Sequence, residues 1–363
     1  MLAGLCHEHD FTVFAVEFEN PDPERIRWVR VAAPLRPYAL LYVVFHLLAP
    51  LTYALHRLKT GCRFDLVQFV ESNLPIGDIS YSHFCHRAYL RQHRRDRITG
   101  VRDAFRLLAH KLAAFMEPGI YRRVRHVVAP SRGLVHEIAA EYHRQPSSMC
   151  VLPNPVDVDR MRMPPAFDRD NARAALGFTP SDLVLVFVAL GHFERKGLPL
   201  MFEAMRRVNN ERLRLVIVGG AVHTVRSWND RARRSGLSSS IRFVGMQRDT
   251  RPFLWMADAF ILPSHYEVFP LVSLEAAAAG LPLIVTQLNG VEEFLQNNVN
   301  GFLIDCSEAG VAEALSRVAA IPRERLREMG SRARGDVQRY ATGHFVAHWR
   351  SFYNNHAILA TAG

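Results

Sequence analysis

The chain has 363 residues, of which 49% are hydrophobic and 22% charged, and its mean hydropathy is −0.03. This composition is that of a globular protein long enough for two domains, and it excludes long disordered or fibrous stretches. The net charge of +10, with 17 histidines counted as neutral, indicates an anionic partner such as a nucleotide-sugar, an anionic membrane surface or nucleic acid, or else a solvated arginine-rich surface.

The first half of the chain has an irregular pattern of apolar residues. Its strands are predicted at residues 11–18, 27–31, 65–70, 78–81 and 126–129, and its helices at residues 104–115 and 133–143.

The most apolar stretch of this half is ALLYVVFHLLAPLTYAL, residues 39–55. At 17 residues, with Pro50 at its centre, it is short and interrupted for a membrane-spanning helix. A buried helix of the first domain is the favoured interpretation. An interfacial helix flanked by Arg36, Arg57 and Lys59 is the second, and a membrane span is the third.

The segment VLPNPVDVDRM, residues 151–161, is typical of a linker, because prolines, an asparagine and aspartates separate two periodic regions. We therefore expect a first domain at residues 1–157 and a second at residues 158–340. The aromatic, amphipathic C-terminus, residues 341–363, is predicted to form a helix that packs back on the first domain.

The second half alternates strands and helices. Strands are predicted at residues 183–190, 213–218, 241–244, 259–262, 282–286 and 302–304. Helices are predicted at residues 198–208, 225–235, 251–257 and 273–279, with a helix-like segment at 290–296. This order predicts a doubly wound, Rossmann-like parallel sheet. The expected fold is therefore α/β, with two Rossmann-like domains facing a cleft in which a ligand would bind.

Two glutamates, Glu267 and Glu275, stand out in PSHYEVFPLVSLEAAAAG, residues 263–280. The first follows an apolar strand and the second lies in the helix-forming run after it. In open α/β sheets, ligands bind at the carboxyl ends of the strands. Two carboxylates there are well placed to accept hydrogen bonds from sugar hydroxyls.

The five cysteines are scattered and show no CxxC spacing. This pattern indicates a reducing compartment and argues against a zinc site or a disulfide framework. The first residues lack the basic and apolar regions of a signal peptide. We expect a cytoplasmic protein, with peripheral attachment to the inner face of the cell membrane as a further hypothesis.

Several ordered motifs together resemble the retaining glycosyltransferases of the GT-B fold, family 4 (glycosyl transferases group 1). They are GHFERKG at residues 191–197, Gly219-Gly220, Val244-Gly245, the Glu-x7-Glu pair EVFPLVSLE at residues 267–275, Gly290 with Glu293, Asn300-Gly301, and LPNPVD at residues 152–157. The resemblance covers roughly residues 120 to 350. It implies that the first domain is the acceptor side and the second binds the nucleotide-sugar.

The resemblance also implies roles for residues of the second domain. Arg195 and Lys196 would stabilise the diphosphate as it leaves, with Gly191 and Gly197 allowing the backbone to approach it. Gly219 is a further donor-binding candidate. Glu275 would accept hydrogen bonds from the ribose, and Glu267 would contact the sugar ring or support positive charge at its anomeric carbon. The remaining donor-binding candidates are Phe269, Leu271 and Val272, through their backbone N–H groups, and Glu293.

In the first domain the resemblance points to YSHFCHRAYLR, residues 81–91. His83 is the first candidate for contact with the donor sugar or acceptor, and His86 is the second, unless one of them only caps the local backbone. Arg87 and Arg91 would hold an anionic acceptor or lie on the surface. Glu117 also occupies a family-like position, and Ser131 is expected to cap the helix that follows it.

The expected activity is hexosyl transfer, with retention, from a nucleotide-diphosphate-sugar to a glycan or lipid-linked acceptor in lipopolysaccharide or exopolysaccharide biosynthesis. No strand end carries an acidic cluster of the kind that binds a catalytic metal, so no cofactor is expected. No motif suggests a nucleic-acid partner.

The sequence departs from the family pattern at a few positions. Pro270 has no N–H to offer, Val268 replaces a common glycine, and His192 stands where many members have arginine. The family's first strand and glycine-rich loop have no counterpart at the start of the chain. An alternative therefore stays open, which is a catalytically impaired nucleotide-sugar-binding or scaffold protein of the same fold.

Overall fold

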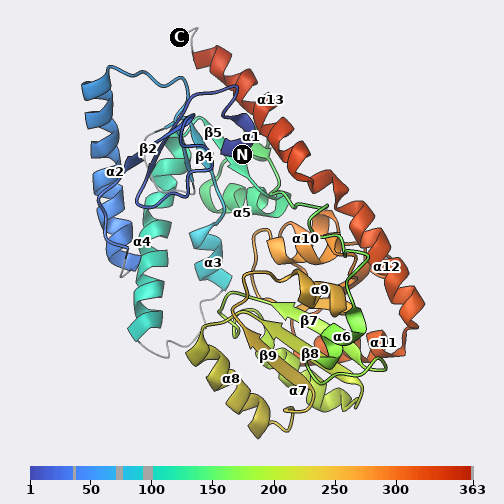
Figure 1. Cartoon of the computed structure of the whole chain (residues 1–363). Helices are drawn as coiled ribbons and strands as arrows, with labels where there is room; N and C mark the ends of the chain where they lie inside the picture. The colour runs from blue at the N-terminus through green and yellow to red at the C-terminus, as the bar shows by residue number, and fades with distance from the viewer. Residues whose placement is uncertain (36–37, 71–76, 93–100, 361–363) are drawn as a thin grey trace. The chain divides into compact units, whose positions relative to one another are not determined.

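The computed structural model describes residues 1–35, 38–70, 77–92 and 101–360. The chain divides into two compact units, which we call unit 1 (Met1–Pro153 and Gly343–Gly363) and unit 2 (Asn154–Thr342) (Figure 1). The first division falls after Pro153, a few residues before the predicted boundary at 157.

Unit 2 is built on one six-stranded parallel sheet with strand order β12-β11-β10-β7-β8-β9. The strands are β7 (Leu183–Val188), β8 (Leu213–Val218), β9 (Ile241–Gly245), β10 (Ala259–Leu262), β11 (Leu283–Thr286) and β12 (Gly301–Ile304). Every residue of β7, β10 and β11 is buried, which explains why these strands are continuous apolar runs and not alternating ones.

Helices connect these strands. They are α6 (Arg169–Ala174), α7 (Leu198–Val208), α8 (Val222–Arg234), α9 (Arg251–Met256), α10 (Leu271–Ala278), α11 (Glu308–Ala320) and α12 (Arg323–Asp336), with short 3₁₀ turns η2 (Val291–Glu293) and η3 (Gln338–Tyr340). Helices α11 and α12 have no counterpart among the predicted elements. Helix α12 is strongly polar and buries a narrow stripe, Leu326, Met329, Gly330 and Ala333, so its helical period is weak in the sequence.

The predicted helix-like segment at residues 290–296 is wrong beyond its first turn, because only η2 forms there. The Asn300 side chain accepts a hydrogen bond from the Gln296 N–H at 2.7 Å and donates one to the Phe294 carbonyl at 2.8 Å. These bonds engage backbone groups that a helix would use, and they hold the segment as a loop.

Unit 1 contains two separate parallel sheets. One has four strands in the order β3-β4-β5-β6, and the other pairs β1 with β2. The strands are β1 (Phe11–Ala15), β2 (Ile26–Arg30), β3 (Gln68–Val70), β4 (Ile79–Tyr81), β5 (His126–Ala129) and β6 (Met149–Val151). Strands β1, β3 and β4 are shorter than predicted, β2 and β5 have the predicted lengths, and β6 has no counterpart among the predicted strands.

The helices of unit 1 are α1 (Leu2–Leu5), α2 (Tyr38–Thr60), α3 (His86–Gln92), α4 (Val101–Arg123), α5 (Arg132–Tyr142) and α13 (Thr342–Ala360), with the 3₁₀ turn η1 (Pro146–Ser148). Helix α13 contributes Phe345, Trp349, Phe352 and Tyr353 to the core of unit 1. Trp349 is fully buried there, and its ring lies 4.9 Å from that of Tyr81.

Helix α2 corrects the favoured interpretation of the apolar stretch in the first half. Among its described side chains only Tyr42 and Ala49 are buried, so it is not a buried core helix. Leu40–Thr60 is the one described segment long and apolar enough to cross a membrane, and 11% of it is buried in the protein. The flanking Arg36 lies outside the described residues. Composition alone could not distinguish a buried core helix from one with an exposed side, because burial depends on whether other elements pack on all sides of the helix.

Candidate active site

The predicted residues Gly191, Arg195, Lys196 and Glu267 lie on two loops that follow neighbouring strands. Strands β7 and β10 are parallel partners, with Phe260 paired to Val186, so their carboxyl ends meet at the same edge of the sheet. The two loops are tied together. The Arg195 carbonyl accepts the His265 N–H at 3.0 Å, and the Arg195 guanidinium donates to the Tyr266 carbonyl at 2.6 Å.

Gly197 makes this close approach possible, and Gly219, which follows β8, allows a similar approach to the end of β7. Both Gly197 and Gly219 have positive φ, +82° and +107°, a conformation that costs other residues free energy. A methyl group at Gly197 would lie 2.0 Å from the Pro263 carbonyl oxygen, and one at Gly219 would lie 1.9 Å from that of Ala189. By contrast, a methyl group at Gly191 would meet no atom within 4 Å. Gly191 therefore borders open space, whereas the other two glycines are needed for packing.

Glu267 is the centre of a charged cluster at this edge. Its Oε1 lies 2.5 Å from Lys196 Nζ and 3.5 Å from the Arg195 guanidinium, and it accepts a hydrogen bond from Ser264 Oγ at 3.0 Å. The side chains of Lys196 and Glu267 are 15% and 12% exposed, so the pair is screened from water only in part. The predicted residues Arg195, Lys196 and Glu267 thus come together, and Ser264 joins them without having been predicted.

Glu275 lies on helix α10, and a charge that the sequence did not point to, that of Arg160, acts on it. Burial raises the pKa of the Glu275 carboxyl above its ordinary value, and the positive charge of Arg160 opposes that shift. A partly buried carboxylate that keeps its charge is a strong acceptor for hydroxyl groups. Arg160 lies at the end of the linker segment, where a charged residue among prolines and aspartates gave no signal in the sequence.

Helix α10 begins at Leu271, two residues earlier than predicted, with Pro270 as its N-cap. The fixed φ of proline suits the entry to a helix. Leu271 and Val272 lie in the first turn of α10, where backbone N–H groups have no acceptor within the helix. These N–H groups and the helix dipole favour an anion at this end.

Phe269 and Glu293 serve the local structure. The Phe269 ring is buried, packs on Gly290, and lies edge-on to Tyr340 with centroids 5.9 Å apart, so only its backbone remains as a candidate donor contact. The carbonyl of Glu293 accepts a hydrogen bond from Arg339. Glu293 therefore belongs to the packing around Tyr340, and a direct contact with the sugar stays a prediction.

One predicted residue of unit 1, His86, is bound to a buried carboxylate, Glu117. Glu117 is fully buried and accepts hydrogen bonds from His86 Nδ1 at 2.7 Å, from the His86 N–H at 3.0 Å, and from the Tyr142 hydroxyl. Burial, and then the Glu117 charge, raise the pKa of Tyr142 far above its ordinary value. This placement favours a supporting role for His86 over the predicted contact with the acceptor.

His83 and the two arginines have different environments. The His83 ring stacks edge-on against Tyr81, with centroids 4.1 Å apart, and the residue is half-buried. Arg87 lies over the Tyr142 ring at 5.1 Å, and Arg91 forms an ion pair with Glu141 at 2.5 Å. His83 thus remains the candidate nearest to solvent among the predicted histidines of unit 1.

Two further sequence predictions concern local chemistry. Ser131 caps α5 by accepting the Leu134 N–H at 3.2 Å, which confirms the predicted cap. All five cysteines are free, so the exclusion of a disulfide framework is confirmed. Among the described residues, Cys6, His7 and Asp22 place potential ligand atoms within 4.8 Å of one another, but none of the three is a predicted site residue.

Two family models match the chain. One is described as glycosyltransferase family 4 and covers residues 2–160, and the other is described as glycosyl transferases group 1 and covers residues 182–320. The chain belongs to the group 1, family 4 glycosyltransferases. The lipopolysaccharide core biosynthesis glycosyltransferase LpsE of Rhizobium meliloti (strain 1021) is 35% identical over 156 residues, which are 42% of this chain and 45% of that protein.

The chain spans about half the length of the curated relatives it matches most strongly. Its likeness to solved structures extends over nearly the whole chain. Sucrose-phosphate synthase of Thermosynechococcus elongatus matches with a TM-score of 0.76 and 18% identity, covering 98% of this chain and 90% of that one. HepE of Anabaena, solved in complex with UDP-glucose, matches with a TM-score of 0.69 and 16% identity, covering 96% and 100%. At these identities the likeness shows the fold, which is GT-B with two Rossmann-like domains.

Proposed function

We propose that the protein is a retaining hexosyltransferase that moves a sugar from a nucleotide-diphosphate-sugar to a glycan or glycolipid acceptor in surface polysaccharide biosynthesis. The observation that carries this proposal is the Arg195–Lys196–Glu267 cluster beside the N-terminus of α10. The name of the relative LpsE supports a lipopolysaccharide acceptor, and the complex of HepE with UDP-glucose supports a uridine diphosphate donor.

The donor's diphosphate needs positive charge, and the site supplies it from three sources. Arg195 and Lys196 carry two full charges, and the N–H groups of Leu271 and Val272 add the positive end of a helix dipole. A diphosphate neutralised in this way needs no divalent cation, so we propose metal-independent chemistry. Burial raises the pKa of the Glu275 carboxyl, and the charge of Arg160 opposes this shift. This carboxylate would accept hydrogen bonds from the ribose hydroxyls.

Glu267 connects donor binding to the reaction. In the structure its carboxylate already engages both cations, so an incoming diphosphate must share them with it. As the glycosidic bond breaks, negative charge grows on the leaving diphosphate and positive charge grows on the anomeric carbon. Lys196 can stabilise the negative charge on the diphosphate, and Glu267 can stabilise the positive charge on the anomeric carbon. The pair therefore stabilises the transition state more than the bound donor.

Retention is proposed to proceed on one face of the sugar. A carboxylate engaged by two cations and a hydroxyl, as Glu267 is, is a weak nucleophile because its lone pairs are already engaged. A covalent glycosyl-enzyme intermediate on Glu267 is therefore disfavoured. The leaving phosphate oxygen can instead take the acceptor's proton while the acceptor oxygen forms the new bond. Since the acceptor would be lipid-linked, the proposed location is the inner face of the cell membrane.

Donor turnover tests this function. The full chain is incubated with UDP-glucose, and UDP release into water is measured for wild type, Glu267→Gln and the matched surface variant Glu313→Gln. Slow release by wild type and by Glu313→Gln, with loss in Glu267→Gln, is expected. Absence of release from UDP-, GDP- and ADP-linked hexoses alike would overturn the proposal.

Stereochemistry is tested separately, on products made with lipopolysaccharide core oligosaccharides as acceptors. An α-linked product from UDP-glucose, measured by proton NMR, supports retention, and a β-linked product contradicts it.

A further inference from the structure

Helix α2 exposes a continuous apolar stripe along its outer side. The stripe consists of Leu40 (46% exposed), Val43 (44%), Leu47 (68%), Leu51 (53%), Leu55 (46%) and Leu58 (81%). At about 100° per residue these positions fall within an arc of about 120°, and the buried Tyr42 and Ala49 lie on the opposite side of the helix. The stripe is roughly 27 Å long at 1.5 Å per residue.

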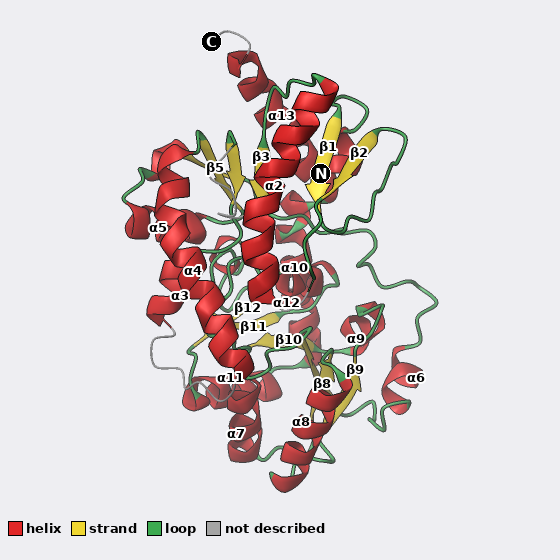
Figure 2. Ribbon diagram, turned by 90° about the vertical axis from the view of Figure 1, so that its left-hand side faces the viewer, coloured by secondary structure: helices red, strands yellow, loops and turns green. Residues whose placement is uncertain are grey.

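The opposite side of α2 is anchored in unit 1. The Tyr42 hydroxyl lies 3.9 Å from Met116 Sδ of α4, and Phe14 of β1 packs edge-on against Tyr53, with centroids 5.7 Å apart. Figure 2 shows α2 and α4 side by side. Helix α4 also exposes large apolar side chains, Phe105, Leu108 and Phe115. An apolar surface of this size on a folded unit marks an interaction site.

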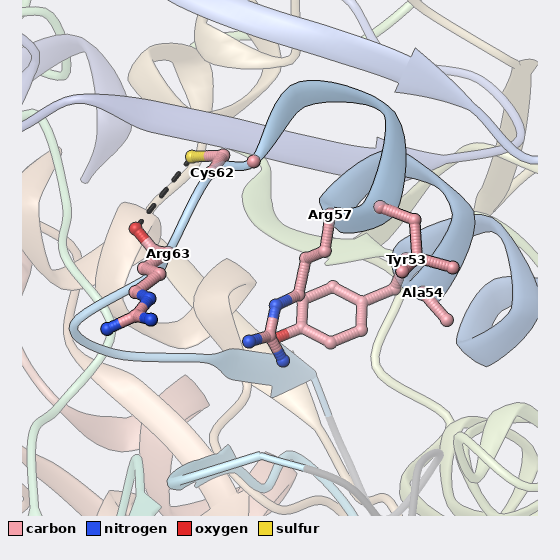
Figure 3. Close-up of a pocket in the computed structure, with 7 residues that line it drawn as sticks. Tyr53, Ala54, Arg57, Cys62 and Arg63 are labelled. Atoms are coloured by element: carbon pink, nitrogen blue, oxygen red, sulfur yellow. Dashed lines mark hydrogen bonds between the residues drawn. The ribbon is translucent and has the colours of Figure 1, made fainter.

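A cationic pocket lies at the C-terminal end of the stripe (Figure 3). Its volume is about 430 Å³, and its lining residues are Tyr53, Ala54, Arg57, Leu58, Gly61, Cys62 and Arg63. The lining includes two arginines and no acidic residue. Among the described residues, neither Arg57 nor Arg63 forms an ion pair with a carboxylate, and the Arg57 guanidinium lies 5.7 Å from the centre of the Tyr53 ring.

The chemistry of this face matches a lipid surface. Helix α2 contains no Asp or Glu, and its only Arg or Lys residues, Arg57 and Lys59, lie in its last turn. An apolar stripe that ends in basic residues is the pattern of helices that lie in a membrane interface, where apolar side chains enter the acyl boundary and cations meet phosphates. A protein partner would need a matching pocket for each exposed leucine, whereas fluid lipid chains need none.

We propose that the apolar stripe of α2 and the pocket lined by Arg57 and Arg63 dock the protein onto an anionic phospholipid bilayer. The helix lies on the bilayer and does not cross it, because its other side is held by Tyr42 and Phe14 and its middle contains Pro50. The docking face is independent of the proposed transfer reaction, since vesicle binding is measured without a donor.

Flotation of the full chain with vesicles tests this proposal. One set of vesicles is phosphatidylcholine alone, and the other is equal parts phosphatidylcholine and phosphatidylglycerol. Wild type is expected to bind the anionic vesicles and to be released by high salt. Arg57→Glu combined with Arg63→Glu should weaken binding roughly tenfold or more, and the triple change Leu47→Ser, Leu51→Ser and Leu58→Ser should weaken it at least as much.

Matched variants show whether changing an exposed apolar or basic residue outside the stripe and the pocket also alters vesicle binding. Val222 is 69% exposed in unit 2 and Leu47 is 68% exposed, so Val222→Ser should leave vesicle binding unchanged, as should Arg332→Glu. Thermal unfolding of each variant shows that it is folded.

Three outcomes would overturn the proposal. The first is equal binding to both kinds of vesicle by wild type and the double arginine variant. The second is attachment that resists alkaline carbonate, which would indicate a membrane span. The third is a wild-type dimer that the leucine changes convert to monomer without any change in vesicle binding, which would show that the stripe contacts a second copy of the chain.

Discussion

The two units share parallel α/β construction, yet they differ in how many apolar side chains they expose. Twelve large apolar side chains are exposed in unit 1 and six in unit 2, among the described residues. Both units bury charged groups, Glu117 in unit 1 and the Arg173–Asp258 ion pair in unit 2, and unit 2 also gathers Arg195, Lys196 and Glu267 at the edge of its sheet. The contrast in exposed apolar side chains fits the proposals that unit 2 binds a small anionic ligand and that unit 1 docks onto a surface.

The largest expected effect tests the charge cluster of unit 2. Glu267→Gln removes the charge that engages Lys196 and Arg195. Turnover should fall roughly 10²- to 10³-fold, because an electrostatic contribution to the transition state is lost. The affinity for UDP, measured by calorimetry, should stay the same or increase, because both cations become available to the diphosphate.

A parallel loss of UDP affinity and turnover in Glu267→Gln would contradict the role given to this residue. Glu313→Gln, an exposed glutamate on α11, is the matched control and should change neither quantity.

The second prediction addresses the buried charge of unit 1. Glu117→Ala leaves the His86 N–H and the Tyr142 hydroxyl without their acceptor. The free energy of unfolding should fall by about 3 kcal/mol, measured by denaturant titration. The affinity for UDP should not change, because the donor residues lie in unit 2. Reduced UDP affinity in a folded Glu117→Ala protein would show that the two units are not separable in this way.

The third prediction compares two glycines of unit 2. Gly219→Ala places a methyl group 1.9 Å from the Ala189 carbonyl oxygen at a φ of +107°, and should destabilise the protein by about 2 to 3 kcal/mol. Gly191→Ala meets no protein atom, so it should keep the stability but weaken UDP binding. Equal destabilisation by both changes, read from their unfolding midpoints, would contradict the assignment of Gly191 to the open ligand side.

The smallest expected effect concerns pH. Burial raises the pKa of Glu275 above its ordinary value of 4.5, so the folded state binds this proton more tightly than the unfolded state. Stability is then lost as pH rises through the raised pKa. Glu275→Gln should therefore be more stable than wild type above that pKa, and the difference should vanish in acid. Unfolding measured across pH checks this, and a difference that grows toward acid would have the wrong sign.

The sequence predicted unit 2 well because its signals are local. Buried parallel strands are continuous apolar runs, as in β7 and β10, and the motif residues follow them directly. Each of the strands predicted for this half corresponds to a strand of the sheet, and Glu267 meets Lys196 because β7 and β10 are neighbours.

What the sequence could not predict depends on distant partners. The charge of Arg160, in the linker segment, acts on the Glu275 carboxyl. The His86 ring is hydrogen-bonded to the buried Glu117, which lies 31 positions away in the sequence. The apolar composition of α2 predicted burial, but the fold packs only one of its sides. In each case the missing information was the position of a residue far along the chain.

Calorimetric titration with UDP-glucose tests most directly the claim that unit 2 binds the donor through its charged edge. Wild type and Lys111→Ala, a matched lysine of unit 1, should bind alike, and Lys196→Ala should bind at least roughly tenfold more weakly, because a charge-assisted contact to phosphate is lost. Equal affinities for wild type and Lys196→Ala, or no binding of any nucleotide-sugar by wild type, would contradict this account.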